Sequence, residues 1–432
     1  MKFRIHTLGC KVNLYESEAI ASQLLNEGFL KATDFENADV EIINTCTVTS
    51  TSDAKSRKLI RSIAKTNSNA VIVVMGCYSQ LNPKSIESID GVDIILGTNN
   101  RHKIPELIKE YVLLKTPINI VKSSDEYKTF EELELHSLTK HTRGFIKIQD
   151  GCENFCSYCA IPYARGPIKS RDAESITLEI KNLVSLGVKE IVLAGINTGT
   201  YGKDLKGISL ASLLRKIIVE VPDLYRVRLS SIELMEVTDE LLDVLAEYPD
   251  KIARHLHIPL QAGADATLKR MHRKYDTKTY AKRIAEIRER LGDIAITTDC
   301  LAGFVGESEI DFECAMTFIQ KMQFMMMHIF PYSRRKNTEA DKMEGHLDPQ
   351  LINKRAHLMQ KLSQSMHKDY IARYLGKEMD VLFEQRKQNL WIGHTTNYLE
   401  VAIDANESDL TNEVRKVKLL SYSDGIIHGE EV

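Results

Sequence analysis

GCENFCSYC, at residues 151–159, places Cys152, Cys156 and Cys159 on one short loop in the spacing C-x3-C-x2-C. Three cysteine thiolates can hold three irons of a 4Fe–4S cluster, which takes four ligands when it is closed. The fourth iron is then open to a ligand that is not a cysteine. A disulfide or zinc loop is the alternative, but zinc sites usually pair cysteines at C-x2-4-C and need a fourth ligand. The spacing therefore favours a cluster with one open iron.

The composition is that of an ordinary globular protein. The 432 residues allow about two to four domains, and no apolar stretch reaches the length of a membrane span. The first residues lack the apolar run of a secretion signal, so we expect a cytoplasmic protein with no membrane partner. In that compartment the eight cysteines are metal ligands or free thiols rather than a disulfide framework. The net charge of −3 does not indicate a nucleic-acid binder.

Residues 1–113 alternate short apolar runs with amphipathic stretches. Strands are expected at 3–8, 40–44, 70–75 and 93–96, and helices at 17–27, 52–65 and 105–110. This alternation is typical of a parallel α/β sheet, and no glycine-rich dinucleotide fingerprint follows the first strand. Residues 114–140 are polar and charged, which indicates a linker or a weakly structured strap.

Residues 141–368 are predicted to form six β/α units. Strands are expected at 145–149, 190–194, 225–229, 255–259, 294–298 and 328–330, with helices between them. Six units are too few for a closed eight-unit barrel and favour a partial (β/α)6 barrel. Ligands of such folds bind at the carboxyl ends of the strands, and the cysteine loop begins right after the first strand.

Residues 369–432 form a third part, which follows a charged helix expected at 354–374. Five short strands are expected in it, at 379–383, 390–393, 399–403, 416–420 and 425–428. Short strands of this number predict a small all-β barrel. The fold class is therefore α/β, with an N-terminal parallel α/β domain, a central partial barrel and a small C-terminal β-barrel.

Three further cysteines each follow a strand of the N-terminal domain. Cys10, Cys46 and Cys77 come one or two residues after the first, second and third strands. Because the carboxyl ends of parallel strands meet at one edge of a sheet, we expect the three thiols to converge and to hold a second cluster. The alternative is three buried, inert cysteines, since free Cys behaves as a small hydrophobe.

Together these features resemble the radical S-adenosylmethionine (AdoMet) methylthiotransferase family over nearly the whole chain. The resemblance rests on LGCKVN (8–13), NTC (44–46), GCY (76–78), QDGC (149–152) and IPYARG (161–166). The C-terminal barrel resembles a TRAM domain, which binds RNA in this family. KVN (11–13), TCTVT (45–49) and AKSR (54–57) are similar to the MtaB branch, whose members act on threonylcarbamoyladenosine at tRNA position 37.

The resemblance implies two 4Fe–4S clusters and AdoMet as cofactors. The expected metal ligands are Cys10, Cys46, Cys77, Cys152, Cys156 and Cys159. The residues expected to contact AdoMet are Tyr158, Gly195, Arg228 and Asp299. The resemblance places Tyr158 near the adenine, Gly195 at the amino group, where glycine admits a close approach, and Asp299 on a ribose hydroxyl at the end of the fifth strand. Arg228 is suited to the AdoMet carboxylate; the alternatives are core packing for Tyr158 and a structural role for Arg228.

The implied reaction adds a methylthio group to carbon 2 of the adenine, which is not a nucleophile. AdoMet would serve twice, as the source of a 5′-deoxyadenosyl radical at the first cluster and as the methyl donor to a sulfur on the second cluster. The cofactors carry the difficult chemistry, and the protein positions them. The resemblance identifies no catalytic side chain. The implied partners are the tRNA anticodon stem-loop, a reducing electron donor and a sulfur source, and the expected state is a monomer.

Three alternatives remain open at this point. The same chemistry on isopentenyladenosine in tRNA, or on an aspartate of a ribosomal protein, fits the same clusters. An iron–sulfur protein that binds RNA or transfers electrons without turnover is the third.

Two basic regions are candidates for RNA contact. Around the cysteine loop these are Lys140, Arg143, Lys147, Arg165, Lys169 and Arg171, which can neutralise phosphates. In the C-terminal barrel they are Arg386, Lys387, Arg415, Lys416 and Lys418, with Trp391 or Tyr398 for base stacking. Acidic residues are interleaved in both regions, so a solvated surface of mixed charge is the alternative.

Overall fold

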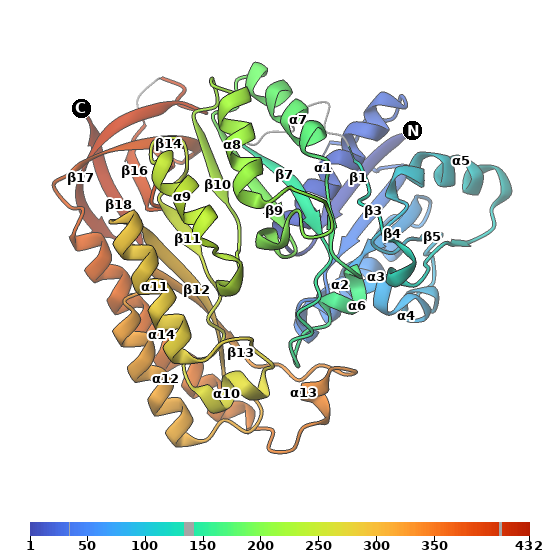
Figure 1. Cartoon of the computed structure of the whole chain (residues 1–432). Coiled ribbons are helices and arrows are strands. Elements are labelled where there is room, and N and C mark those ends of the chain that lie inside the picture. The colour runs from blue at the N-terminus through green and yellow to red at the C-terminus, as the bar shows by residue number, and fades with distance from the viewer. Residues whose placement is uncertain (34, 134–141, 406–407) are drawn as a thin grey trace.

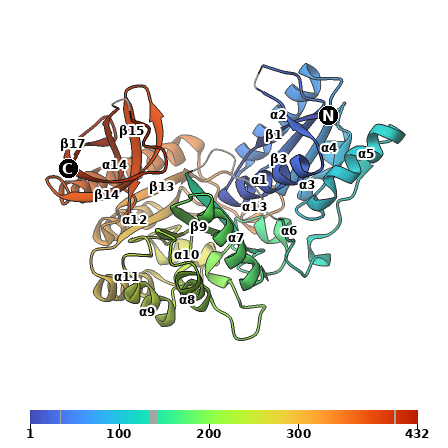
Figure 2. The same ribbon diagram turned by 90° about the horizontal axis from the view of Figure 1, so that it is seen from above.

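The computed structural model describes residues 1–33, 35–133, 142–405 and 408–432. Three parts follow one another along the chain: an N-terminal α/β domain, a central partial barrel and a small C-terminal β-barrel (Figure 1). The two outer parts flank the central part (Figure 2). The fold class expected from the sequence is thereby confirmed.

The N-terminal domain is built on a six-stranded parallel sheet of order β2-β1-β3-β4-β5-β6. Its strands are β1 (Lys2–Thr7), β2 (Leu30–Lys31), β3 (Val40–Thr45), β4 (Val71–Gly76), β5 (Ile94–Ile95) and β6 (Ile118–Asn119). Its helices are α1 (Lys11–Asn26), α2 (Ser50–Thr66), α3 (Cys77–Leu81), α4 (Pro83–Glu87), α5 (Ile104–Leu114) and the 3-10 turn η1 (Arg101–Lys103).

Apolar residues on both faces of the strands give this sheet two cores. Ile42 and Val73 pack on one face with residues of α1 and α5. Ile43 and Val74, their direct neighbours in sequence, pack on the other face with residues of α2 and α4. Successive strand residues point to opposite faces, so continuous apolar runs are what a sheet covered on both sides requires.

The segment expected to be a linker is more ordered than the sequence indicated. β6 pairs with β5 and extends the sheet, and the 3-10 turn η2 (Ser124–Glu126) follows it. Leu133, further along the segment, accepts a hydrogen bond from the hydroxyl of Tyr15 at 2.5 Å. The polar composition therefore marks a strap that packs along the first domain; residues 134–141 of the expected linker lie outside the described residues.

The central part carries the six predicted parallel strands. These are β7 (Arg143–Asp150), β9 (Glu190–Gly195), β10 (Arg226–Leu229), β11 (His255–His257), β12 (Ala295–Ala302) and β13 (Met326–Pro331). The two-residue strand β8 (Lys169–Ser170) adds an antiparallel edge next to β7. A bridge between Ser231 and His257 joins the β7–β10 group to the β11–β13 group, so the strands form one partial barrel.

The helices of this part enclose the barrel on the outside. They are α6 (Ile161–Arg165), α7 (Ala173–Ser185), α8 (Leu210–Glu220), α9 (Asp239–Glu247), α10 (Asp265–Arg270), α11 (Thr277–Leu291), α12 (Glu309–Met322) and α13 (Glu339–Lys342), with η3 (Thr198–Thr200) and η4 (Leu234–Glu236). Several begin after a residue whose side-chain oxygen accepts a backbone N–H, such as Asp172 before α7 and Ser209 before α8. Such caps satisfy donors that the first helical turn leaves free.

The long helix α14 (Pro349–Ala372) leads into the C-terminal barrel. The barrel is closed in the order β14-β15-β16-β18-β17. Its strands are β14 (Glu378–Lys387), β15 (Leu390–Thr395), β16 (Glu400–Asp404), β17 (Val414–Ser423) and β18 (Ile426–Glu431). The five strands predicted from the sequence are all present.

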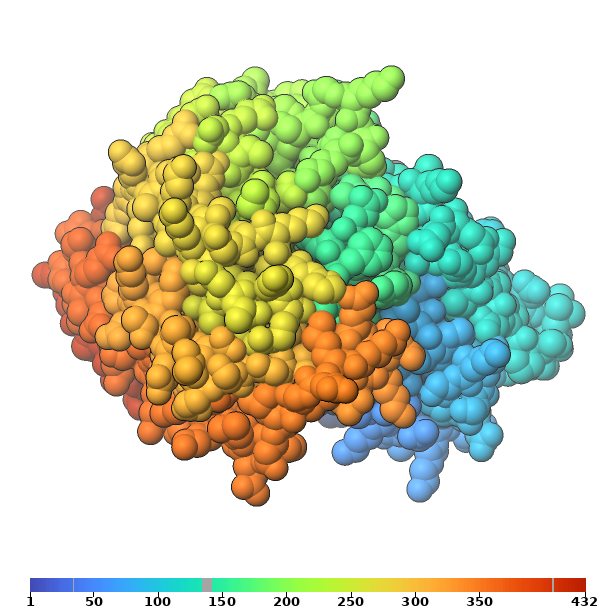
Figure 3. Space-filling model, turned by 60° about the horizontal axis from the view of Figure 1, so that its bottom comes forward, coloured from blue at the N-terminus to red at the C-terminus, as the bar shows by residue number. Residues whose placement is uncertain are grey.

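The segment around α13 reaches from the central barrel to the N-terminal domain (Figure 3). Arg335, which precedes α13, donates hydrogen bonds to the backbone carbonyl and side chain of Thr47. The hydroxyls of Ser333 and Ser50 also meet across this contact. Within the described ranges, no helix is long and apolar enough to cross a membrane.

Candidate functional site

The cysteine loop starts where β7 ends. Gly151 follows Asp150 with a φ of +80°, and a Cβ at this position would lie 1.8 Å from the carbonyl oxygen of Pro167. Only glycine tolerates both the backbone conformation and the close approach. The chain therefore turns sharply out of the barrel and places Cys152 at the carboxyl end of the strand.

The three thiols of this loop are electrostatic neighbours. Burial raises the pKa of Cys152 to about 11 and that of Cys159 to about 12, and the nearby thiols, including that of Cys156, add to both increases. Cys156 Sγ accepts a hydrogen bond from Arg273 at 3.3 Å, and Cys159 Sγ accepts one from the N–H of Ile161 at 3.4 Å. Metal binding must displace the thiol protons, and these donors stabilise the sulfur once it is charged.

The three cysteines of the N-terminal domain also converge, as expected. The register pairs Thr45 of β3 with Gly76 of β4, so the loops after both strands leave the same edge of the sheet. A Cβ on Gly9 would lie 2.9 Å from Cys46 Sγ, which puts the residue before Cys10 against Cys46. The pKa of each of the three thiols, Cys10, Cys46 and Cys77, is affected by the charge of another of the three. The thiols therefore lie close together.

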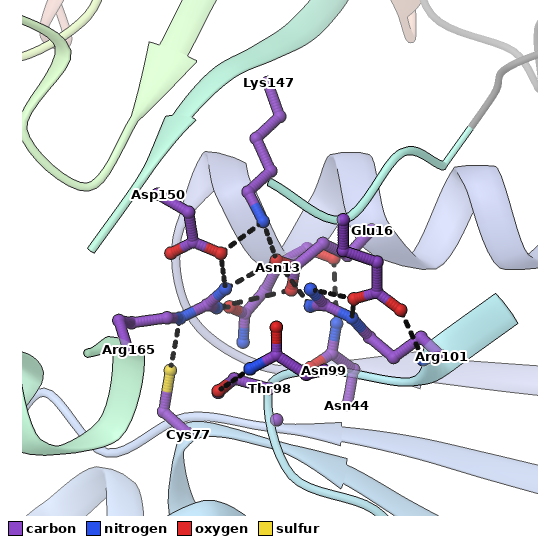
Figure 4. Close-up of polar contacts among 12 residues, drawn as sticks. Asn13, Glu16, Asn44, Cys77, Thr98, Asn99, Arg101, Lys147, Asp150 and Arg165 are labelled. Atoms are coloured by element: carbon purple, nitrogen blue, oxygen red, sulfur yellow. Dashed lines mark hydrogen bonds and ion pairs between the residues drawn. The ribbon is translucent and has the colours of Figure 1, made fainter. Parts of the chain in front are cut away.

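A buried charge network links Asp150, which directly precedes the first cysteine triad (Cys152, Cys156 and Cys159), to Cys77 of the second triad (Cys10, Cys46 and Cys77) (Figure 4). The Glu16 carboxylate on α1 lies 2.5 Å from both Arg101 and Arg165 and 2.7 Å from Lys147. Asp150, which directly precedes the cysteine loop, pairs with Lys147 at 2.5 Å and with Arg165 at 3.3 Å. All five side chains are buried.

Arg165 connects this network to the second triad. Its Nε donates to Cys77 Sγ at 3.1 Å, and its Nη2 donates to Asn13 at 2.8 Å. Burial raises the pKa of the Cys77 thiol, while the Arg165 guanidinium acts in the opposite direction. A guanidinium aimed at sulfur favours the thiolate, which is the form that ligates metals. The donor set thus fits a cluster at Cys10, Cys46 and Cys77.

The predicted phosphate-binding role of the basic residues near the loop is wrong for most of them. Lys147, Arg165, Lys169 and Arg171 are at most 1% exposed. Arg171 pairs with Glu179 and Glu132, and Lys169 donates to the carbonyl of Arg165. Sequence spacing shows the charges but not their burial, because the acidic partners come from distant elements. Lys140 lies outside the described residues.

Residues of all three parts of the protein line a cavity of about 410 Å³. The N-terminal domain contributes Gly9–Val12, including Cys10, the partial barrel contributes its strand interior, and the C-terminal barrel contributes Tyr398. Tyr398 stacks on His255 at 4.9 Å, and the Arg228 guanidinium lies 5.0 Å from its ring centre. Tyr398 is thus part of this cavity, and Trp391, the other proposed stacking residue, is buried.

A polar cluster lies in this cavity on β11, β12 and β13. His257 Nε2 is 3.3 Å from the Asp299 carboxylate, and its Nδ1 is 2.9 Å from the hydroxyl of Thr297. His328 brings a ligand atom within 4.8 Å of both His257 and Asp299. Burial lowers the pKa of His328, and Asp299 acts against this change. The sequence did not single out His328, because one histidine in an apolar strand carries no pattern.

Lys11 is the first residue of α1 and is open to the same cavity. The surrounding protein removes water from its amine, and Arg143 and Arg228 repel its charge, which lowers the pKa of Lys11 to about 8. Among the residues that the structure describes, no ion-pair partner of Lys11 is found. The two arginines have such partners: Arg228 lies 2.9 Å from Glu190, and Arg143 lies 2.9 Å from Glu384.

The four predicted AdoMet contacts separate into two groups, of which Gly195 and Tyr158 form the first. Gly195 ends β9 and lines the cavity, and a Cβ there would lie 2.9 Å from the side chain of Gln149. Tyr158 packs edge-on against Phe304 at 6.1 Å beside the cysteine loop. The roles of Gly195 and Tyr158 in binding AdoMet stay predictions.

Arg228 and Asp299 have other surroundings than the sequence suggested, and their roles in binding AdoMet stay predictions. Arg228 is buried against Glu190 and donates to the carbonyls of Thr395 and Thr396, so it holds the C-terminal barrel and its charge is already neutralised. Asp299 lies in the middle of β12, which runs to Ala302 rather than ending near 298. It faces the cavity next to His257, so its position inside the barrel replaces the expected position at the strand end.

The network predicts a specific loss of stability in acid. Burial alone would raise the pKa of Glu131, but Arg101 at 2.7 Å lowers it to about 2. Because this lies below the ordinary value of 4.5, the pair stabilises the fold above that pH and is lost as the pH falls toward 2. We expect the difference in unfolding free energy between wild type and Glu131→Gln to shrink between pH 7 and pH 3, by about 2 kcal/mol.

Urea denaturation at both pH values measures this difference. Glu27→Gln, an exposed carboxylate paired with Lys109, is the matched control and should show little change. A wild-type to Glu131→Gln difference that is the same at both pH values would contradict the assignment.

Comparison with known proteins agrees with this geometry. Residues 146–319 match the Radical SAM superfamily, and residues 2–97 match the uncharacterized protein family UPF0004. A three-cysteine loop at the carboxyl end of a partial β/α barrel, with this match, defines a radical AdoMet enzyme that uses a 4Fe–4S cluster and AdoMet.

Curated relatives span nearly the whole chain. The threonylcarbamoyladenosine tRNA methylthiotransferase MtaB of Bacillus subtilis is 42% identical over 430 residues, covering 97% of this chain and 95% of the relative. MtaB of Thermotoga maritima is 40% identical, with 88% and 86% covered. The tRNA-2-methylthio-N(6)-dimethylallyladenosine synthase of Clostridium botulinum is 32% identical, with 100% and 97% covered. The chain therefore belongs to the radical AdoMet tRNA methylthiotransferase family.

Solved structures share the fold at low sequence identity. The radical AdoMet methyltransferase TsrM of Kitasatospora setae superposes with a TM-score of 0.57 at 13% identity, covering 77% of this chain and 73% of that chain. The cobalamin-dependent enzyme OxsB superposes with a TM-score of 0.52 at 11% identity, covering 82% and 56%. These likenesses support the fold alone.

Proposed function

We propose that this protein adds a methylthio group to carbon 2 of N(6)-threonylcarbamoyladenosine at position 37 of tRNA. AdoMet serves as radical source and as methyl donor. The observation that carries the proposal is that Cys10, from the second triad, lines the same cavity as the interior of the radical AdoMet barrel. The relatives named for threonylcarbamoyladenosine support the choice of substrate.

Two 4Fe–4S clusters are proposed, one on each triad. Cys152, Cys156 and Cys159 would hold the first, and Cys10, Cys46 and Cys77 the second. When bound, the first supplies the electron that cleaves AdoMet reductively, and the second holds the sulfur to be transferred. Three cysteines at each site would leave a cluster one protein ligand short of four, which would suit both tasks.

The chain's own residues orient these sites. Glu16, Lys147, Asp150 and Arg165 lock the loop after β7 against the loops of the N-terminal domain. Tyr398 and His255 close one side of the cavity by stacking. Rigid positioning of this kind shortens the search for a reactive geometry.

The partners follow from the same proposal. The substrate would be the anticodon stem-loop of tRNA in the cytoplasm, and a reducing protein and a sulfur source complete the reaction. A monomer suffices, because one chain supplies both triads. In the C-terminal barrel the exposed basic residues Arg386, Lys387, Lys416 and Lys418 are the candidates for phosphate contact.

Reconstituted protein with a reductant, a sulfur source, AdoMet and a stem-loop carrying threonylcarbamoyladenosine tests the proposal. We expect the methylthio nucleoside, 5′-deoxyadenosine and S-adenosylhomocysteine, each measured by mass spectrometry. Product on the dimethylallyladenosine stem-loop alone would assign the other tRNA substrate. AdoMet cleavage without a modified nucleoside on either RNA would overturn the proposed reaction.

A further inference from the structure

The cavity contains one cation that the protein leaves without a counter-charge. Lys11 is open to the space between the N-terminal domain and the barrel, and no ion pair to it is found among the described residues. Arg228, which lines the same cavity, is paired with Glu190. An unpaired cation in the wall of a cavity attracts a ligand that supplies the opposite charge.

The Asp299 carboxylate in the cavity already has a partner. Asp299 lies 3.3 Å from His257, and His328 flanks both. A second carboxylate entering the cavity would be repelled beside Asp299 and attracted at Lys11. The start of α1 at Lys11 adds the positive end of a 16-residue helix on the same side.

The proposed substrate carries such a carboxylate. In threonylcarbamoyladenosine the threonine is joined through its nitrogen, which leaves its carboxylate free. A dimethylallyl substituent has no charged group. The N6 substituent and carbon 2 lie on the same edge of the adenine, with N1 between them. A residue next to the cluster ligand Cys10 is therefore well placed to reach the substituent when carbon 2 faces the sulfur.

We propose that Lys11 determines substrate specificity by pairing with the threonyl carboxylate while carbon 2 of the base faces Cys10. This inference rests on the proposed function and deepens it to a single contact. A site that supplies a charge for its substrate discriminates against an analogue that lacks the partner. Val12 and Gly9, its neighbours in the cavity, offer no charge of their own.

The contact can be tested without turnover by comparing how two RNAs bind to wild type and to variants of Lys11. Two stem-loops are compared, one with threonylcarbamoyladenosine and one with its carboxamide, in which the carboxylate is neutral. Their affinities are measured by fluorescence anisotropy for wild type, Lys11→Gln and Lys11→Arg, with Lys58→Gln on the exposed face of α2 as the control. Iron content is measured on each sample.

We expect wild type and Lys58→Gln to prefer the carboxylate RNA by roughly 10- to 100-fold. Lys11→Gln should bind both RNAs equally with its iron content unchanged, and Lys11→Arg should keep part of the preference. A Lys11→Gln variant that keeps the full preference, or that weakens both RNAs by the same factor, would overturn the inference. Loss of iron in Lys11→Gln would overturn it too, since Lys11 would then act on the cluster.

Failure of this inference is distinct from failure of the proposed function. The same wild-type samples are given AdoMet, a reductant and a sulfur source, and the methylthio nucleoside is measured. If wild type forms product but its preference for the carboxylate RNA does not depend on Lys11, the inference alone is overturned. Absence of product from both the threonylcarbamoyladenosine and the dimethylallyladenosine stem-loops overturns the proposed function.

Discussion

Replacing Cys10, Cys46 and Cys77 together with alanine is expected to remove about half of the iron and all methylthio product. AdoMet cleavage should continue, because Cys152, Cys156 and Cys159 remain. The physical reason is that the two triads sit on separate elements, one at the carboxyl edge of the N-terminal sheet and one after β7. The measurements are iron per chain, 5′-deoxyadenosine and the modified nucleoside.

The reciprocal triple variant at Cys152, Cys156 and Cys159 should lose both AdoMet cleavage and product. Cys314→Ala is the matched control, since this thiol is exposed on α12, away from both triads, and should leave the iron content unchanged. If the N-terminal variant kept all of its iron, the second cluster would have to lie elsewhere.

Glu16→Gln is expected to lower the free energy of unfolding by about 3–5 kcal/mol. Burial by itself would raise the pKa of Glu16, but Arg101, Arg165 and Lys147 hold it well below its usual range. Removing this one charge leaves the three buried cations to the remaining carboxylates, and an uncompensated buried charge is more costly than the pair was worth. Denaturant unfolding measures the loss.

The control for this variant is Glu36→Gln. Glu36 pairs with Lys2 at the surface, where solvent screens the charge, so little change in stability is expected. Because Glu16 also orients Arg165 next to Cys77, Glu16→Gln should weaken iron retention in the N-terminal triad before it affects the loop after β7. A variant as stable as wild type would show that the network is not a structural support.

The regular elements could be predicted because they depend on local patterns. Apolar runs bounded by polar residues located β3 and β4 to within a residue or two, and all five strands of the C-terminal barrel. The position of Cys10, Cys46 and Cys77 just after parallel strands was enough to predict their convergence. Parallel strands that pair in one sheet bring residues that are far apart in the sequence close together in space.

The buried charges could not be predicted in the same way. Glu16 and Arg165 are 149 residues apart, and no periodicity relates them. The same basic residues near the cysteine loop therefore suggested phosphate contacts, whereas the structure pairs them internally. The surroundings of Arg228 and Asp299 could not be predicted for a related reason: both lie on barrel strands, but the partner that each side chain meets depends on other parts of the fold.

The cavity could not be predicted from the sequence either. Its walls come from residues around the start of α1 at Lys11, from strands of the partial barrel and from Tyr398 of the C-terminal barrel. Tyr398 was expected to stack on RNA at the surface, yet it packs between His255 and His394. Only the packing of three domains brings these side chains to one place.

The most direct test of the central claim is nucleoside mass spectrometry of tRNA from cells that lack this gene. The account predicts that the methylthio form of threonylcarbamoyladenosine disappears while its unmodified precursor persists. Reintroducing the gene should restore the methylthio form, and the Cys10, Cys46 and Cys77 variant should not. An unchanged nucleoside profile in the deletion strain would contradict the account.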